Sequence, residues 1–237
     1  MAYTGPVIAS SDYDDVALST TGTADITVTT GARLVVLISS SAGSQRTNAT
    51  GVTDTQGNTW TQVQSQDMNN RVVSIWHAVA ASSGSLTVTA TYSHATNWHL
   101  CALALGQPAD LDTSDSFGNT VNGTTFHAAP VGALDTSPQS LLISVFALNA
   151  TVTSWSPGTG FTAIRSSIVS THVYHSQYLQ SEAGETDNRC GCTTTGSARN
   201  GPAASVAYVV APGGDPTPPD AFRSRAFQSV AMRGQST

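Results

Sequence analysis

The chain contains no lysine, and only two of its 237 residues are glutamate, Glu182 and Glu185. Helical surfaces are built mainly from Glu, Lys, Gln, Arg and Ala, so this chain lacks residues that a helical protein needs on its exposed faces. In their place stand 33 Thr and 30 Ser. A hydrophobic fraction of 39% argues against wholesale disorder. The composition therefore predicts an all-β protein and argues against coiled coils and α/β folds.

Alternation of apolar and polar residues with a period of two dominates the chain. Residues 85–92, SLTVTATY, place Leu and Val on one face and Thr on the other, which is typical of a half-buried antiparallel strand. The apolar runs at 33–39 and 140–148 predict strands buried on both faces. Further strands are predicted in the segments 24–29, 71–80, 97–105, 120–127, 172–180 and 203–210. No helix is predicted, and the residues after Asp110 are predicted as loop.

The order of these segments predicts an internal duplication, with one half at about 31–106 and the other at 140–210. Gly57 matches Gly158 and Trp60 matches Phe161 at an offset of 101, whereas the opening strands match as Leu34 and Leu141 at an offset of 107. Neither half has enough strands to cover both of its faces. The sequence therefore predicts one antiparallel β-sandwich, jelly-roll-like, built from two pseudo-repeated halves.

The two ends of the chain are predicted to differ from this body. Residues 1–30 are predicted as an N-terminal arm, Met1–Ser11, followed by the first strands. Residues 211–220 hold four Pro and two Gly and predict a stiff linker. Residues 221–237 predict a docking arm, with a disordered terminus as the alternative. The residues expected to touch a partner are Phe222, Arg223, Arg225, Phe227, Met232 and Arg233.

The charge of the chain restricts its partners. The formal net charge is −6, with −8 in residues 1–219 and +2 in residues 220–237. A nucleic-acid-binding body needs a positive surface, so no direct nucleic-acid partner is predicted. The first residues lack the basic and apolar regions of a secretory signal, and no apolar run reaches about 18 residues. We therefore expect a protein made in the cytosol, with no membrane partner.

Cysteine and histidine give no strong site. Cys101, in an apolar run, is predicted as a core residue. Cys190 and Cys192 are predicted on one face of a strand, with a strained disulfide or a metal contact as alternatives. His172 and His175 would point to opposite faces of a strand, which is poor metal geometry.

Other candidates also have simpler interpretations. Trp98, between His94 and His99, could form part of a sugar-binding platform, but we favour a position in the core or in a subunit contact. Trp76 and His77 are predicted as core and interface residues. The acidic residues that follow the first half, Asp110, Asp112 and Asp115, suit a loose calcium loop less well than a solvated loop. The usual serine-nucleophile, P-loop and zinc-protease motifs are absent. We therefore predict no catalytic residue, no metal and no cofactor.

The segment VTDTQGNTWTQV, residues 52–63, carries a turn whose logic is structural. Asp54 can accept a hydrogen bond from the backbone two residues on, Gly57 and Asn58 tolerate positive φ, and Trp60 can then enter the core. With the Ser83-Gly84 turn and the alternating strand that follows, this pattern resembles β-sandwich proteins of tailed-bacteriophage virions. The second half, with PGTGFTAI, resembles the continuation.

The resemblance implies a virion structural protein without enzymatic activity. A capsid decoration or cement protein would sit on the outer capsid surface of a bacteriophage after assembly in the host cytoplasm. Its partners would be the major capsid protein and further copies of itself, in a homotrimer. The alternative is a carbohydrate- or receptor-binding module of a phage tail or cell surface, with Trp98, Tyr174 or Tyr178 lining an exposed groove.

Overall fold

The computed structural model describes most of the chain between residues 8 and 210. The described residues are 8–41, 48–68, 70–106, 109–121, 125–126, 135–149, 152–169, 172–186, 188, 190–196 and 199–210. Among them every regular element is a β-strand, and all strand pairs are antiparallel. The prediction of an all-β, antiparallel protein is confirmed. The predicted linker and docking arm lie outside the described residues.

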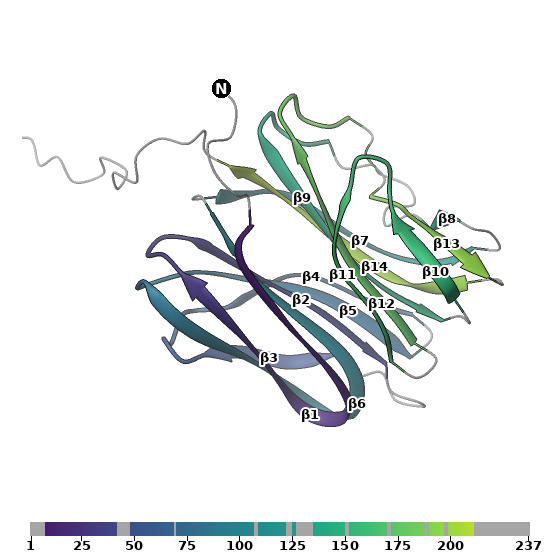
Figure 1. The fold of residues 1–237 in the computed structure, drawn as a ribbon, viewed down its shortest axis with the longest axis horizontal. Coiled ribbons are helices and arrows are strands. Elements are labelled where there is room, and N and C mark those ends of the chain that lie inside the picture. The colour runs from purple at the N-terminus through teal and green to yellow at the C-terminus, as the bar shows by residue number, and fades with distance from the viewer. Residues whose placement is uncertain are drawn as a thin grey trace, which may run out of the picture.

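The strands form two large sheets and a small one (Figure 1). The first sheet has the order β1 (Ile8–Val28), β6 (Gly84–Leu105), β2 (Arg33–Ser41), β5 (Arg71–Val79) and β4 (Thr61–Met68), and β3 (Ala49–Asp54) pairs with β6. The second has the order β11 (Thr162–Val169), β12 (His172–Ser181), β9 (Ser140–Asn149), β14 (Arg199–Val210) and β7 (Ala109–Val121). The third has the order β10 (Val152–Pro157), β13 (Cys192–Gly196) and β8 (Thr125–Phe126).

The two large sheets face each other across a shared apolar cluster. Leu37 of β2 and Ile75 of β5 lie in this cluster with Ile143 of β9 and Val206 of β14, and all four are fully buried. The next residues along each strand point to the opposite face, because side chains alternate along a strand. Both β2 and β9 are buried on that face too, as their continuous apolar runs predicted.

Each large sheet is also covered on its outer face, which points away from the other large sheet. The first sheet bends, so that β3 and the adjoining halves of β1 and β6 fold over its outer face, where Ile26, Leu86 and Val88 pack against Leu34 and Val36. The outer face of the second sheet carries another buried cluster, which includes Phe146 and also Cys192 of β13 in the third sheet. Buried apolar layers therefore lie on both sides of β2 and of β9.

The bend in the first sheet corrects one prediction. Segments 85–92 and 97–105 were expected to be separate strands, but both belong to the single strand β6. The polar residues between them resemble a turn, yet the backbone stays paired with β1 through register shifts between Val16 and Thr21. Bulges of this kind bend a strand without ending it.

The two large sheets have the same strand order. Reading the second sheet from β7 to β11 gives strands that correspond to β1, β6, β2, β5 and β4 of the first sheet. The edge strand β4 packs on β7 and β14, and β1 packs on β11, so the sheets face each other with exchanged edges. Each sheet also contains a strand, β1 or β7, that the predicted halves left outside.

The predicted alignment of the two halves needs one correction. Leu34 lies in the outer cluster of the first sheet, whereas Leu141 lies in the cluster between the sheets. Residues paired at an offset of 107 therefore lie on non-equivalent faces of the two sheets. An alignment that is wrong by one residue has this effect, because successive side chains of a strand point to opposite faces. Cross-strand partners give the consistent match: Leu34 lies opposite Ala78 and Ala104, and Leu142 lies opposite Leu179 and Ala207.

A second correction concerns the segment after Asp110. It was predicted as loop, but residues 109–121 form β7, which pairs along β14. Its Asp and Ser residues have low strand propensity, and pairing with the buried strand β14 overrides that preference. The strand predicted at 120–127 corresponds to the end of β7 and to the two residues of β8. No helix of membrane-spanning length and hydropathy occurs among the described residues.

Gly22 tests the fold over the first sheet. A Cβ atom at Gly22 would overlap the ring of Trp98, which is fully buried and stacks on Tyr92 at a centroid distance of 5.8 Å. We expect Gly22→Ala to lower the free energy of unfolding by about 3 kcal/mol, measured by chemical denaturation. The control is Gly51→Ala, whose Cβ would meet only Thr91 Oγ1 at 3.8 Å. Equal losses for the two variants would contradict this packing.

Candidate functional site

The predicted turn at residues 54–60 is organised by one carboxylate. Asp54 Oδ1 accepts hydrogen bonds from the Gln56 N–H at 2.8 Å, as expected, and from the Asn58 N–H at 3.3 Å. Asp54 Oδ2 accepts a bond from Trp60 Nε1 at 2.6 Å. Gly57 adopts φ of +72°, a conformation that glycine takes without steric cost. The carboxylate is therefore used to hold the turn.

Asn58 differs from its expected role. It is absent from the described residues with positive φ, and its Oδ1 instead accepts a hydrogen bond from the Ala81 N–H at 2.9 Å. This bond ties the turn to the end of β5. Trp60 is half-buried and packs against the outer cluster of the first sheet. Asp54, Gly57, Asn58 and Trp60 thus form a structural unit at one end of that sheet.

The aromatic residues proposed for a sugar-binding groove are buried. Trp98 and Tyr174 are both fully buried, and Tyr178 is half-buried against the cluster between the sheets. The expectation that they line an exposed groove is therefore wrong for Trp98 and Tyr174. The side chains of both strands point alternately into packed layers on the two sides of the sheet. Neither ring therefore has a solvent-exposed face. Trp98 lies in the core, one of the two positions that we favoured.

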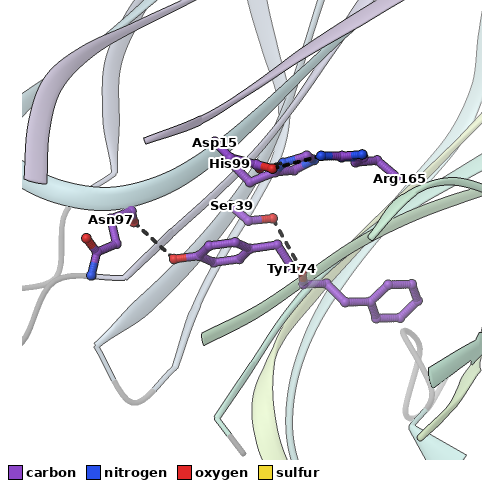
Figure 2. A network of polar contacts seen from close by, with 7 residues as sticks. Asp15, Ser39, Asn97, His99, Arg165 and Tyr174 are labelled. Carbon is purple, nitrogen blue, oxygen red and sulfur yellow. Dashed lines mark hydrogen bonds and ion pairs between the residues drawn. The ribbon is translucent and has the colours of Figure 1, made fainter. Parts of the chain in front are cut away.

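A network of charged and polar side chains lies between the two large sheets (Figure 2). Asp15 of β1 and His99 of β6 are cross-strand partners, and His99 Nδ1 lies 2.5 Å from Asp15 Oδ1. Arg165 Nη2, from β11 of the opposite sheet, lies 3.1 Å from Asp15 Oδ2. Because an ionised carboxylate only accepts, Nδ1–H of His99 is the donor. Asp15 thus joins the two large sheets.

Burial and hydrogen bonding compete at Asp15. Desolvation raises the pKa of this carboxyl, but the hydrogen bonds and charge of His99, with bonds from Ser167 and Arg165, outweigh it and lower the pKa from 3.8 to about 2. Asp15 therefore remains ionised across the neutral range. Hydrogen bonds from an arginine and a histidine stabilise the ionised carboxylate, and they offset the cost of placing a charge between packed sheets.

Aromatic rings enclose this network. The Arg165 guanidinium lies 3.5 Å from the centroid of the Tyr13 ring, and the ring of Tyr13 is about half exposed. Tyr174 stacks near His99 with centroids 6.2 Å apart and donates its hydroxyl proton to the Asn97 carbonyl at 3.1 Å, as Figure 2 shows. His99 itself is fully buried, and its Nε2 has no hydrogen-bond partner among the described atoms. No substrate can reach this imidazole without opening the sheets.

The opposite edge of the packed sheets is joined by neutral bonds. Gln64 Nε2 of β4 donates to Ser114 Oγ of β7 at 3.1 Å. Near this edge, the Tyr208 hydroxyl lies 3.3 Å from His77 Nδ1, so His77 contacts the opposite large sheet. Trp76, on the other face, packs against the outer cluster. Polar bonds thus flank the apolar cluster on both sides.

His175 forms a second buried polar group, on the other face of β12. It is 1% exposed, stacks on Phe146 at 5.8 Å, and its Nε2 lies 3.3 Å from Gln177 Oε1. Gln177 in turn donates to the Gly191 carbonyl at 3.0 Å. Burial, and then the charge of His99, lower the pKa of His175 well below 6.5. His175 is therefore neutral in the folded protein at neutral pH.

The three cysteines are buried thiols. Cys101 lies in the cluster between the sheets, as predicted, and burial raises its pKa to about 12. Cys190 and Cys192 both lie in the outer cluster of the second sheet, but only Cys192 is in a strand, since Cys190 precedes β13 with φ of +38°. They do share one apolar environment. Such thiols are poor nucleophiles, because the thiolate is the reactive form.

The acidic residues of β7 are spread along a strand. Asp110 is 98% exposed and lies 3.5 Å from Arg33, whereas Asp112 accepts bonds from the backbone and hydroxyl of Ser137 at 2.7 and 3.1 Å. The side chain of Asp115 lies outside the described residues. Across the described part of the chain, no group of three or more His, Cys, Asp or Glu could hold a metal ion.

Sequence patterns singled out His99 but missed Asp15 and Arg165. Asp15 falls in a polar stretch, DYDD, that looks like a solvated strand end. Arg165 is a lone cation in β11, and 150 residues separate it from Asp15. Only the pairing of β1 with β6, and the packing of β11 on both, brings them together. Comparisons with protein-family models, with curated proteins and with solved structures find no match to this chain.

The Asp15 network predicts a pH-dependent loss of stability. We expect Asp15→Asn to lower the free energy of unfolding by about 2 kcal/mol at pH 7, because it leaves Arg165 and His99 without a carboxylate. A lowered carboxyl pKa stabilises the fold above about pH 4, and this contribution disappears as pH falls toward 2. Denaturation of both proteins from pH 7 to 2 should show their stabilities converging. Asp110→Asn, at an exposed pair, should change stability by less than about 0.5 kcal/mol.

His175 predicts a separate effect at mildly acidic pH. Its pKa is lowered in the folded state, so the unfolded chain binds one more proton below about pH 6.5. Because of this one proton, the free energy of unfolding should fall by about 1.4 kcal/mol for each unit by which the pH drops below 6.5. In His175→Gln, that part of the slope between pH 6.5 and 4.5 should vanish. An unchanged slope would show that His175 is protonated in the folded protein.

Proposed function

We propose that the chain is a non-enzymatic virion structural protein, a decoration or cement protein on the outer surface of a tailed-bacteriophage capsid. The observation that carries the non-enzymatic part is the placement of its reactive groups. His99 and His175 are 0% and 1% exposed, and the Cys101 thiol is buried with a pKa of about 12. These two imidazoles and this thiol, which could transfer protons or attack a substrate, are enclosed between layers.

The capsid assignment draws on the turn pattern at 53–61 and on the composition of the C-terminal segment. The proposed body is a jelly-roll-like β-sandwich, and the proposed assembly is a homotrimer that bridges capsomers. Its mechanism would be the burial of surface, at roughly 1,600 Å² for a standard contact, repeated by symmetry. Of the large hydrophobic residues described, only Tyr13, Val79 and Leu111 are exposed. The contacts would therefore come chiefly from the arms.

The alternative, a carbohydrate- or receptor-binding module, has less support. Trp98 and Tyr174 are unavailable to a sugar in the folded body. The sugar-binding groove that we expected required these rings to be exposed, so that sugar faces could pack on them. Tyr13 is about half exposed, and its ring already covers the guanidinium of Arg165.

The experiment is co-sedimentation of the protein with undecorated phage capsids, followed by cryo-electron microscopy of the shells. We expect the full chain to saturate symmetric sites and a 1–211 truncation to bind at least tenfold more weakly. A full-length variant with Phe222→Ser, Phe227→Ser and Met232→Ser should behave like the truncation, because it removes the apolar anchors. The matched control is Ser224→Ala with Ser229→Ala.

Two outcomes would contradict the proposal. If the full chain binds no capsid, the decoration function is wrong. If the truncation binds a glycan array with saturable affinity, the carbohydrate module becomes the better account of the body.

A further inference from the structure

An open pocket lies at the end of the first sheet, beside the turn that the sequence singled out. Its volume is about 420 Å³, and its walls come from residues 57–59, the beginning of β4, the end of β5 and Arg33. Small-molecule sites in proteins begin at about 300 Å³. The pocket is therefore large enough for a small ligand or for one side chain of a partner.

Arg33 gives the pocket a cation with unused donors. Its Nε donates to the Ala109 carbonyl at 2.7 Å, and Nη2 donates to Asp110 Oδ1 at 3.5 Å. A guanidinium has five N–H groups, so three remain after these two bonds to described atoms. The side chain of Asp110 is 98% exposed, and solvent screens an ion pair of that kind. The charge of Arg33 is thus only weakly neutralised.

The other polar side chains in the pocket wall can donate hydrogen bonds. Asn58 Nδ2 is buried and has no hydrogen-bond partner among the described atoms, although Oδ1 of the same amide is bonded to Ala81. His77 uses Nδ1 toward the Tyr208 hydroxyl, which leaves Nε2. Thr59 and Thr61, which carry hydroxyls, also line the pocket. Among the described residues that line the pocket there is no carboxylate.

Electrostatics at His77 agree with a positive pocket. Burial, and then the charge of Arg33, lower the pKa of His77 below 6.5. The imidazole therefore senses the positive charge of the guanidinium, in a body whose residues 1–219 carry a net charge of −8.

We propose that this pocket binds a carboxylate group, from a small acid or from an acidic side chain of a polypeptide, against Arg33, Asn58 and His77. A carboxylate is planar, accepts up to four hydrogen bonds and matches a guanidinium in a two-bond geometry. It would satisfy the orphan amide of Asn58 and the free N–H groups of Arg33 together. The site does not depend on the capsid proposal.

The test uses the full-length protein and follows the His77 imidazole by NMR, with calorimetry in parallel. The probes are N-acetylglutamate, its neutral isostere N-acetylglutamine, inorganic phosphate and a short peptide containing one glutamate. We expect both glutamate probes to shift the His77 signals saturably and to raise the pKa of His77. The comparison of the free acid with the peptide identifies the source of the carboxylate, because a polypeptide ligand should bind more tightly.

Three variants separate binding from folding. Arg33→Gln should weaken the binding of N-acetylglutamate at least tenfold. Asn58→Asp keeps an acceptor for the Ala81 N–H but places a carboxylate in the pocket, so it should abolish binding even where Arg33→Gln disturbs the fold. Asp110→Asn removes the competing exposed acid and should retain or tighten binding. Equal responses to N-acetylglutamine or phosphate, or binding that survives Asn58→Asp, would overturn the carboxylate site.

Discussion

The architecture depends on two strands that have no solvent-facing side. β2 and β9 carry continuous apolar runs, so each must be covered on both faces. One face of each is covered by the opposite large sheet, through the cluster that holds Leu37 and Ile143. The other face requires a further layer, which the bent halves of β1 and β6 supply for the first sheet. The layered arrangement follows from that double burial.

The carboxylate that lies between the sheets is paired both within its own sheet and across to the other one. Asp15 lies among packed layers, yet contacts with His99 and Arg165 keep its pKa near 2. Such a pair contributes little net stability over an apolar contact, but losing one partner is costly. A network of this kind holds the two halves in one relative position, since the guanidinium and the carboxylate must meet.

The sequence predicted features that are local. Alternation at 85–92 identified a strand, the run at 140–148 identified a doubly buried one, and Asp54 identified a turn. Features that depend on tertiary packing were missed. The polar stretch near residue 95 stays within β6 because β1 pairs with it, and residues 109–121 become a strand because β14 offers a partner. Arg165 could not be linked to Asp15, since nothing local connects residues 150 positions apart.

The matching strand orders of the two sheets have a consequence for how the chain can vary. In a dimer of identical subunits, every substitution appears twice, once on each side of the axis. Here both halves are encoded separately within one chain, so one edge can hold the charged Asp15–Arg165 contact while the other holds the neutral Gln64–Ser114 contact. One half is therefore free to acquire a feature, such as the Arg33 pocket, without the same change in the other. Covalent fusion of the halves turns a symmetric arrangement into a body with distinguishable sides.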